Sequence, residues 1–412
     1  MFRRLVVDSL ESRVLLACDA GAFVVNVLDD VVDSDLTNCS LREAIDEATM
    51  SGLTTPVITF DPSIRGGTIN LDLALGELVV GKQMIIDAGP IQSQRGDGIT
   101  VSAALANDGA STPIRVISVD DGVDPGCGGL MPPNPCDSFV QKVEIRNMTI
   151  TGGTKTGAIV PVGEGGGGGI RVFQGEQLVI RDSVISGNSA SSEGGGLAAY
   201  DYSAPPATPV YIYNTSITDN MGGGVFFSGV GNATNLKIED SLISGNESAL
   251  GYDTGGVFVR GNGGTVNITR STITGNSAAD GGGARIIANS FRNDSGDVFN
   301  ACINVDSSTF EGNTALFAGS GILVETDTIA DQGSSVFGCP EPAAGMTYFA
   351  DEPVVQLTNV TVSGNTNEQF GNGAVAVQDA GFTTRIRHST IVDNSNNNPS
   401  GADGLFLQNN PS

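Results

Sequence analysis

The chain has 412 residues, with 57 Gly, no Trp, and 46 Asp or Glu against only 20 Lys or Arg. Its formal charge of −26 argues against nucleic-acid binding, because such a chain cannot neutralise phosphates. The charge instead favours solubility, cation binding or tolerance of an ion-rich exterior. No stretch approaches the ~20 apolar residues that a membrane-spanning helix needs.

Residues 1–20 form a candidate targeting tail. Charged residues such as Asp8 and Glu11 interrupt what would be the apolar core of a secretory signal. The segment Leu10–Ala17, LESRVLLA, resembles the LEPR-x-LL sorting motif of surface and exported proteins in planctomycete-type bacteria, with Ser12 in place of Pro. That resemblance implies export. A disordered amphipathic tail is the alternative, because chain termini are often disordered.

An acidic run follows the first predicted strand, at residues 23–30. Asp29, Asp30, Asp33 and Asp35 fall within seven residues of one another. Carboxylates and backbone carbonyls are the ligands that Ca²⁺ prefers, so the run is a candidate calcium site and calcium the one candidate cofactor. The run lacks the ordered spacing and closing Glu of an EF-hand loop, and a solvated acidic turn is the alternative.

Residues 40–48 carry the clearest helical pattern in the chain. Ser40 is a natural N-cap, and Glu43 completes a capping box. The apolar residues of one helical face are Leu41, Ala44, Ile45 and Ala48. Such a short helix is suited to covering the open first coil of a solenoid, where unpaired strand edges would otherwise invite association.

The heptad Cys39–Ile45, CSLREAI, resembles the signature of CSLREA-type N-terminal regions. Those regions lead into right-handed parallel β-helix repeats of the polymorphic outer-membrane-protein and pectin-lyase-like kind. The resemblance therefore implies a right-handed parallel β-helix on the bacterial exterior. It implies no single activity, because the group mixes surface proteins of unknown role with enzyme relatives.

A repeated unit, typified by Val266–Ile286, recurs eight times along the rest of the chain. Apolar residues recur at a spacing of two before and after a Gly-rich corner, which is the period of a strand. The unit length of about 25 to 50 residues predicts a solenoid in which each strand pairs in parallel with its copy ~4.8 Å away. We therefore expect an all-β fold with a sorting tail over 1–20, an N-terminal cap and irregular coils over 21–142, and about eight coils over 143–408.

An Asn marks the same corner in seven of the eight copies. Its side chain is suited to bonding the backbone of the neighbouring coil at a corner that tolerates positive φ, which predicts a scaffold role. The Gly runs beside it resemble phosphate loops, but no Lys-Ser/Thr and no helical pattern follows them. We expect them to be bends that need positive φ and close approach between coils. The anchor residues are Asn188, Asn220, Asn246, Asn276, Asn313, Asn365 and Asn394, with Gly153 in the first copy.

The six Cys fall into three pairs that are near in sequence. We expect loop-stapling disulfides in an oxidising compartment, although sequence alone leaves the connectivity open. A metal site is the alternative, but CxxC spacing is missing and the chain has one His. The expected pairs are Cys18–Cys39, Cys127–Cys136 and Cys302–Cys339.

The repeat places a row of outward residues on adjacent coils. Phe226, Phe258 and Arg285 align in this row, and Tyr200 and Arg260 lie two residues further along their strands. A flat aromatic row flanked by Arg is suited to stacking sugar rings and holding carboxylates, which makes Phe226, Phe258, Arg285 and Tyr200 the candidate ligand site. Long loops that fold over the row and bury it are the alternative, because large exposed apolar patches are unusual.

Catalytic motifs are sparse. Polygalacturonase-like hydrolases resemble this fold, but their Gly-His-Gly and Arg-x-Lys elements are absent, and the sole histidine, His388, occupies a turn column. A lyase with an Arg base and Ca²⁺ remains open, with Arg285 and Arg260 as the candidate bases. The repeat columns place no three acids beside them.

These observations predict an exported cell-surface or extracellular β-helix with a structural, adhesin-like or glycan-binding role. The alternative is a polysaccharide lyase or other carbohydrate-active enzyme that acts on acidic glycans. The expected partners are polysaccharide or cell-envelope components. No capping helix follows the C-terminal coil, which leaves three alternatives: the loops cover it, the chain is a short form, or another chain pairs with it end to end.

Overall fold

The structure is a computed structural model of the chain. It describes residues 18, 22–33, 35, 37–91, 94–120, 142–156, 166–173, 176–200, 209–230, 235–248, 255–262, 264–292, 297–325, 335–337, 354–369, 372–378, 383–399 and 401–408. Within these residues no helix is long and apolar enough to cross a membrane.

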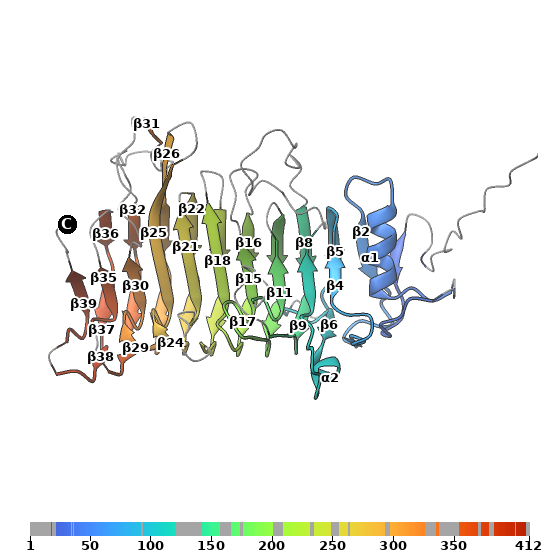
Figure 1. Cartoon of the computed structure of the whole chain (residues 1–412), viewed down its shortest axis with the longest axis horizontal. Coiled ribbons are helices and arrows are strands. Elements are labelled where there is room, and N and C mark those ends of the chain that lie inside the picture. Colours follow the sequence, from blue (N-terminus) through green and yellow to red (C-terminus); the bar gives the residue numbers. More distant parts are fainter. Residues whose placement is uncertain are drawn as a thin grey trace, which may run out of the picture.

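Three long sheets run the length of the molecule, and within each one the strands of successive coils lie side by side (Figure 1). Sheet A contains, in spatial order, β1 (Phe23–Val25), β2 (Val57–Phe60), β5 (Met84–Asp87), β8 (Lys142–Arg146), β12 (Gln177–Arg181), β16 (Val210–Tyr213), β19 (Asn235–Glu239), β22 (Thr265–Thr269), β27 (Cys302–Asp306), β32 (Val354–Thr358) and β36 (Thr383–Arg387). Sheet B contains β3 (Thr68–Asn70), β6 (Ile99–Ser102), β9 (Met148–Thr151), β13 (Val184–Ser186), β17 (Ser216–Thr218), β20 (Leu242–Ser244), β23 (Thr272–Thr274), β28 (Thr309–Glu311), β33 (Thr361–Ser363) and β37 (Thr390–Val392).

Sheet C completes each coil. Its main path contains β4 (Leu78–Val80), β7 (Ile117–Val119), β11 (Ile170–Val172), β15 (Leu197–Tyr200), β18 (Val225–Val230), β21 (Val257–Asn262), β25 (Ala284–Arg292), β30 (Ile322–Glu325), β35 (Val375–Gln378) and β39 (Leu405–Gln408). Shorter elements at the corners and edges are α2 (Ala104–Asn107), β10 (Thr154–Lys155), β14 (Ser189–Ala190), β24 (Ser277–Asp280), β26 (Asp297–Asn300), β29 (Thr314–Ala318), β31 (Ser335–Phe337), β34 (Thr366–Asn367) and β38 (Ser395–Asn396).

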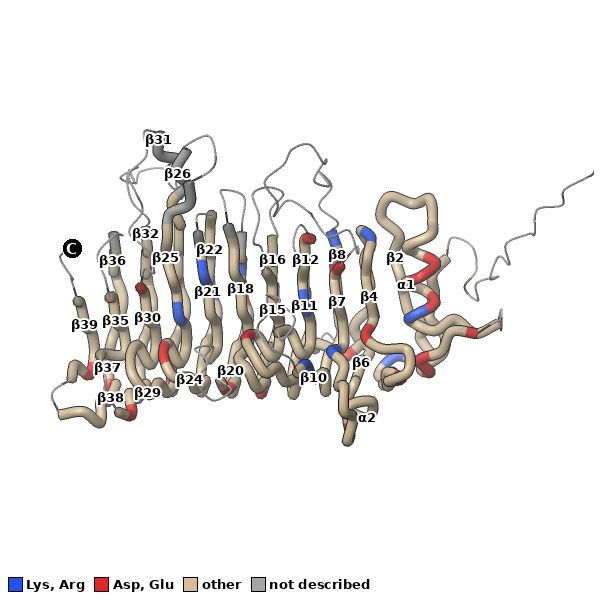
Figure 2. Tube along the Cα trace, in the orientation of Figure 1, with Lys and Arg blue, Asp and Glu red and all other residues tan. Residues whose placement is uncertain are grey.

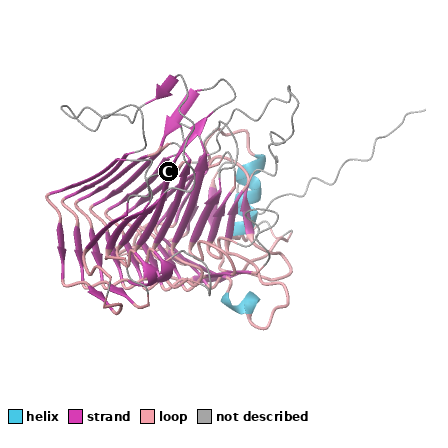
Figure 3. Cartoon of the chain, turned by 60° about the vertical axis from the view of Figure 1, so that its left-hand side comes forward, coloured by secondary structure: helices cyan, strands magenta, loops and turns pink. Residues whose placement is uncertain are grey.

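The coils stack in register. In sheet A, for example, Ile238 pairs with Ile268 in the parallel ladder between β19 and β22, and both side chains are buried. The same alternation buries one residue in two along most strands, which gives a continuous apolar core between the three sheets. Figure 3 shows the stack obliquely, with strands of successive coils parallel and the chain turning sharply between sheets. The predicted all-β parallel solenoid is confirmed.

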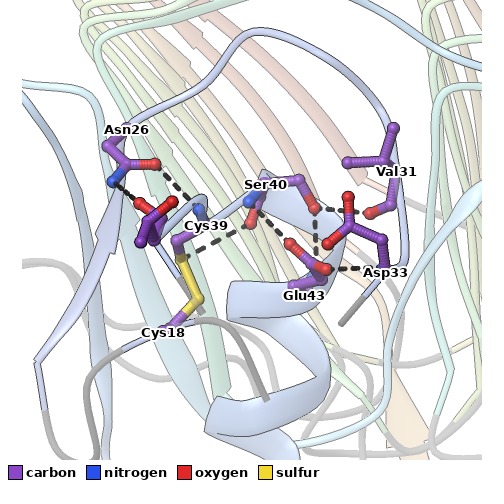
Figure 4. Close-up of a disulfide and its surroundings, with 8 residues drawn as sticks. Cys18, Asn26, Val31, Asp33, Cys39, Ser40 and Glu43 are labelled. Atoms are coloured by element: carbon purple, nitrogen blue, oxygen red, sulfur yellow. Dashed lines mark hydrogen bonds between the residues drawn. A yellow bond between two sulfur atoms is a disulfide. The ribbon is translucent and has the colours of Figure 1, made fainter. Parts of the chain in front are cut away.

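A helix covers the first coil, as the sequence predicted. Helix α1 (Leu41–Met50) packs against β1, β2 and β4. The Oγ of Ser40 accepts a hydrogen bond from the Glu43 backbone N–H at 3.2 Å, and Glu43 Oε2 accepts one from the Ser40 N–H at 2.9 Å. Glu43 Oε1 also accepts from the Asp33 N–H, so one buried carboxylate joins the helix start to the preceding loop (Figure 4). The capping box is confirmed.

The repeated Asn forms a buried ladder. Asn276 Oδ1 accepts hydrogen bonds from both the backbone N–H and the side-chain amide of Asn246, at 3.0 and 2.9 Å. Its own amide donates to Ile243 O, one coil away, at 3.0 Å. The scaffold interpretation is confirmed, with one correction. The positive φ falls on the residue before the Asn, here Gly275 at 63°, and not on the Asn itself.

The Gly-rich corner has both properties that the sequence predicted. Gly281 has a φ of +61°, which strains any other L-residue. A Cβ on Gly283 would collide with the carbonyl oxygen of Gly321 in the next coil. The corner therefore consists of bends and close backbone contacts, and the resemblance to a phosphate loop is superficial.

We predict that Asn276→Ala destabilises the protein by about 2–4 kcal/mol, because two buried donors of Asn246 lose their acceptor. Asn267→Ala is the matched control, since Asn267 lies on the outer face of the same coil and is half-buried. Urea unfolding followed by circular dichroism measures both. Equal losses of stability in the two variants would contradict the role of the ladder.

Candidate functional site

The outer face of sheet C holds the residues that the sequence proposed as a ligand site. Phe226, Phe258 and Arg285 occupy one register position on β18, β21 and β25. Tyr200 on β15 joins them, with its ring centroid 5.0 Å from that of Phe226, which in turn lies 5.3 Å from Phe258. We call Tyr200, Phe226 and Phe258 the aromatic row. The structure therefore brings the predicted residues together.

The aromatic row is nevertheless buried. Tyr200 is 3% exposed and Phe226 and Phe258 are each 4% exposed, and they pack with Ala198 and Ile287 in one cluster. A sugar ring needs an exposed aromatic face to stack on. The rings therefore offer no open stacking face, and of the two alternatives from the sequence, burial is the one that the structure supports.

Arg285 and Arg260, the two candidate catalytic bases, lie beside Phe258. Their guanidinium carbons are 5.3 and 6.0 Å from the Phe258 ring centroid. Arg285 donates from Nε at 2.7 Å and from Nη2 to the same oxygen of Glu325. A guanidinium is always protonated and carries only donors, so an Arg held by a carboxylate is suited to cohesion or anion binding and not to proton abstraction.

A buried charged cluster lies at the other end of this face, and the sequence analysis missed most of it. Arg115 is fully buried, and its Nε lies 3.3 Å from Glu77 Oε2. Buried Arg171 lies 3.6 Å from Asp120 and stacks on Phe173 at 4.5 Å. Buried charges are costly unless paired, and they mark candidate functional sites. Arg115 precedes the first regular coil, so no repeat column could identify it.

Tyr200 connects this cluster to the aromatic row. Burial raises the pKa of its phenol well above the ordinary value, and nearby Glu193 raises it further. A hydrogen bond with Ser192 and the charges of Arg115 and Arg171 lower it by less. The phenol therefore stays protonated at physiological pH. It can donate a hydrogen bond, but it is unsuited to act as a general base.

The charges on this face are matched locally. Arg115 lies beside Glu77, Arg171 beside Asp120, and Arg285 beside Glu325. Figure 2 shows the basic residues spread singly among the strands of sheet C and not gathered in one patch. Such pairing stabilises neighbouring coils against each other and leaves little charge for a ligand.

Sheet A carries a half-buried polar and aromatic stripe on its outer face that the sequence analysis also missed. Tyr211 and Tyr213 point outward from β16, with ring centroids 6.4 Å apart. The Arg181 guanidinium lies 4.1 Å from the Tyr213 centroid, and the Lys237 ammonium lies 5.1 Å from it. Alternating tyrosines in VYIY were the available sequence signal. Because two cations already contact Tyr213, its ring is occupied within the protein.

Glu144 anchors the same stripe. Its Oε1 accepts hydrogen bonds from Arg146 Nε at 2.9 Å and Arg181 Nε at 3.0 Å. Burial alone would raise the pKa of Glu144, but the hydrogen bonds from Arg146 and Arg181 and the charges of Arg146 and Lys142 outweigh burial, so the pKa falls below its ordinary value. The ionised carboxylate therefore stabilises the folded state.

We predict that Glu144→Gln lowers stability by about 1–2 kcal/mol at pH 7 through lost charge-assisted hydrogen bonds. The folded pKa is the lower one, so this contribution is present above the unfolded pKa of ~4.3 and disappears as pH falls through the folded value. Urea unfolding of both proteins from pH 7 to pH 3 should show the gap closing. Exposed Glu311→Gln is the control, and a gap that persists at pH 3 would contradict the assignment.

The described residues of the acidic run near the N-terminus make contacts within the protein. Asp30 binds Arg42 through two 2.8 Å hydrogen bonds, so its carboxylate is already neutralised. Asp33 accepts a hydrogen bond from the Asp35 backbone within a turn. Among the described residues no group of three or more His, Cys, Asp or Glu is placed to hold a metal. Calcium binding stays a prediction, and the spacing of the run did not indicate that Asp30 pairs with Arg42, 12 residues away on a helix.

We predict that Arg42→Met destabilises the protein by about 3 kcal/mol, because it leaves the buried Asp30 carboxylate uncompensated. The double variant Asp30→Asn/Arg42→Met should recover part of that loss. Thermal unfolding with Ca²⁺ or with EDTA should give one melting temperature for the wild type. A calcium-dependent rise that Asp30→Asn abolishes would restore the metal hypothesis.

Cysteine pairing is visible for part of the chain. Cys18 and Cys39 form a disulfide beside the start of α1 (Figure 4). Cys302 is also disulfide-bonded, but Cys339, its expected partner, lies outside the described residues. Cys127 and Cys136 lie outside them as well. The structure thus contains the first expected pair, next to the helix that caps the stack.

Comparison with known protein families gave one match. A family model described as right handed beta helix region matches residues 136–255. Comparison with curated proteins and with solved structures gave no match. Together with the three parallel sheets, the family match gives the fold as a right-handed parallel β-helix.

Proposed function

We propose that the protein is an exported β-helix of the cell surface or extracellular space, with a structural and adhesin-like role and no catalytic activity. One observation carries the proposal. The three candidate aromatic side chains on sheet C are buried, and Arg285 is paired with Glu325, while Arg260 is exposed beside Phe258. A face organised in this way holds coils together, which suits a rigid scaffold.

The construction of the stack supports a mechanical role. The buried Asn ladder joins successive coils from Asn188 to Asn394 through side-chain and backbone hydrogen bonds. Helix α1 covers the first coil, where open strand edges would otherwise invite association. Each coil contacts only its neighbours, so a β-helix can lengthen coil by coil along one continuous core. Such a long, rigid shape suits a protein that presents a binding surface at a distance from the cell.

Four features support export. The Cys18–Cys39 disulfide is typical of an oxidising compartment. The net charge of −26 suits an ion-rich exterior. The segment Leu10–Ala17 resembles a sorting motif, and the heptad Cys39–Ile45 resembles that of surface β-helix proteins. Polysaccharide or cell-envelope components are the proposed partners.

End-to-end contact at the C-terminal coil is part of the same proposal. Leu405 and Leu407 occupy inward columns of β39, yet they are 43% and 65% exposed. Apolar strand residues at the end of a stack are suited to packing against a further β-helix coil. Such packing would suit assembly into longer surface structures.

A polysaccharide lyase is the second candidate. The observation that favours it is the placement of Arg260 and Arg285 on either side of Phe258, next to a carboxylate. That arrangement is suited to binding a uronate carboxylate. Glu325 opposes it, because it occupies Arg285 within the protein.

We predict that the purified chain gives no unsaturated product from uronate polysaccharides, with or without Ca²⁺, in an ultraviolet absorbance assay. The same preparation should cosediment with insoluble cell-envelope material, which measures adhesion without turnover. Arg270→Ala, in the turn that follows β22, is the control. Turnover that is abolished by Arg285→Ala or Arg260→Ala, but not by Arg270→Ala, would overturn the non-catalytic proposal. Failure to cosediment would remove the adhesin-like role.

A further inference from the structure

A pocket of about 360 Å³ lies away from sheet C, where the loop between β5 and β6 crosses the corner between sheets A and B. Nothing in the sequence analysis pointed to it. The residues that line it are Pro90, Gln94, Arg95, Asn147, Asp182 and Asn214.

The floor of the pocket is a ladder of turn residues. Asn147, Asp182 and Asn214 occupy the same corner in three successive coils, with φ of 58°, 52° and 44°. Because the coils repeat every ~4.8 Å, their side chains form a regular row of polar groups. Asn214 Nδ2 donates to Asp182 Oδ1 at 2.6 Å, and Asn147 Nδ2 donates to Asp87 Oδ1 at 2.9 Å. These bonds fix the orientation of the floor.

The roof is equally fixed. Gly96 donates its N–H to the Asp182 carbonyl at 2.7 Å. Arg95 donates to Asn214 Oδ1 at 2.9 Å, to Ser216 Oγ at 3.0 Å and to the Asp240 carbonyl at 2.8 Å. One arginine thus contacts two successive coils and attaches the loop to the stack. A binding site held on a rigid scaffold in this way pays little ordering entropy on binding.

Three polar groups in the pocket remain available. Asp182 Oδ2, Asn147 Oδ1 and the side-chain amide of Gln94 have no hydrogen-bond partner among the described residues. The first two only accept, and the amide both donates and accepts. Exposed Pro90 adds an apolar wall. A complementary ligand must therefore carry groups that donate and accept hydrogen bonds, beside an apolar surface.

The charges select against ionic ligands. The donors of Arg95 are used within the protein, and the Asp182 carboxylate together with a net charge of −26 repels anions. The Arg95 guanidinium in the lining opposes a metal cation. Hydroxyl groups on a carbon ring meet the remaining demands, since each hydroxyl donates and accepts and the ring offers C–H groups to Pro90.

We infer that this pocket is a binding site for a neutral sugar unit, whose hydroxyls donate to Asp182 Oδ2 and Asn147 Oδ1 and exchange hydrogen bonds with Gln94. The assignment gives the protein a specific glycan contact on the corner between sheets A and B. The proposed adhesin-like function enters this inference only as the source of the sugar, a glycan of the cell envelope. The hydrogen-bonding groups of the pocket are the same whether or not the protein is exported.

Saturation-transfer-difference NMR on the full chain tests the inference. The probes are methyl glycosides of glucose, galactose, mannose and N-acetylglucosamine, with glucuronate as the charged comparator, at ~10 mM, where a site with a Kd of ~1 mM is mostly filled. At least one neutral glycoside should show saturation transfer, and glucuronate should show none. Silence from every neutral probe, or equal transfer to glucuronate, would overturn the assignment.

Variants locate the site. Asp182→Asn tolerates positive φ but loses the carboxylate, and Gln94→Ala removes the amide, so each should weaken binding by about tenfold. Asp393→Asn makes the same chemical change at another exposed turn with positive φ, outside the pocket lining, and should leave binding unchanged. Equal loss in Asp393→Asn would remove the pocket from consideration. Sugar binding by a chain that does not cosediment with envelope material would refute the adhesive function while keeping the pocket.

Discussion

The in-register hydrogen bonding of buried Asn side chains is the constraint on which the rest of the structure depends. From Asn220 onward each Asn accepts two hydrogen bonds from the Asn of one neighbouring coil and donates to a backbone carbonyl, as Asn276 does with Asn246 and Ile243. A buried amide without these partners costs free energy, so a coil shifted by one residue is strongly disfavoured. Once one corner is fixed, the apolar columns, the Gly corners and the outer rows all align.

That alignment determines what the surface can do. Outward residues on successive coils come within contact distance whether or not they serve a ligand, and most of the charged ones are paired. Arg285 lies against Glu325 on sheet C, and Arg181 lies against Glu144 on sheet A. Much of the chemistry that a sequence pattern suggests is thereby used for cohesion. The pocket between sheets A and B differs, because there a loop from outside the regular coils leaves polar groups of Asp182 and Gln94 without partners among the described residues.

The N-terminal heptad shows how a conspicuous motif can serve architecture alone. Cys39 forms a disulfide, Ser40 and Glu43 close the capping box, and Leu41 enters the core. Arg42 binds Asp30 and two backbone carbonyls of the Gly76–Glu77 turn. Every one of these contacts stabilises the junction between α1 and the first coil. The heptad is therefore explained by the need to close the end of a β-helix, and it carries no information about a ligand.

Local periodicity was enough to predict the coils, the Asn ladder and the start of α1, because each depends on contacts that repeat at a fixed spacing or lie within one helical turn. Burial of Phe226 and Phe258, the fully buried Arg115 and the pairing of Arg42 with Asp30 were decided only by tertiary structure. The pocket was also decided by tertiary structure, because Arg95 bonds Asn214, which lies 119 residues further along the chain. Such contacts join segments that do not repeat, so no sequence period predicts them. Only the folded chain determines which of its polar groups remain available to a ligand.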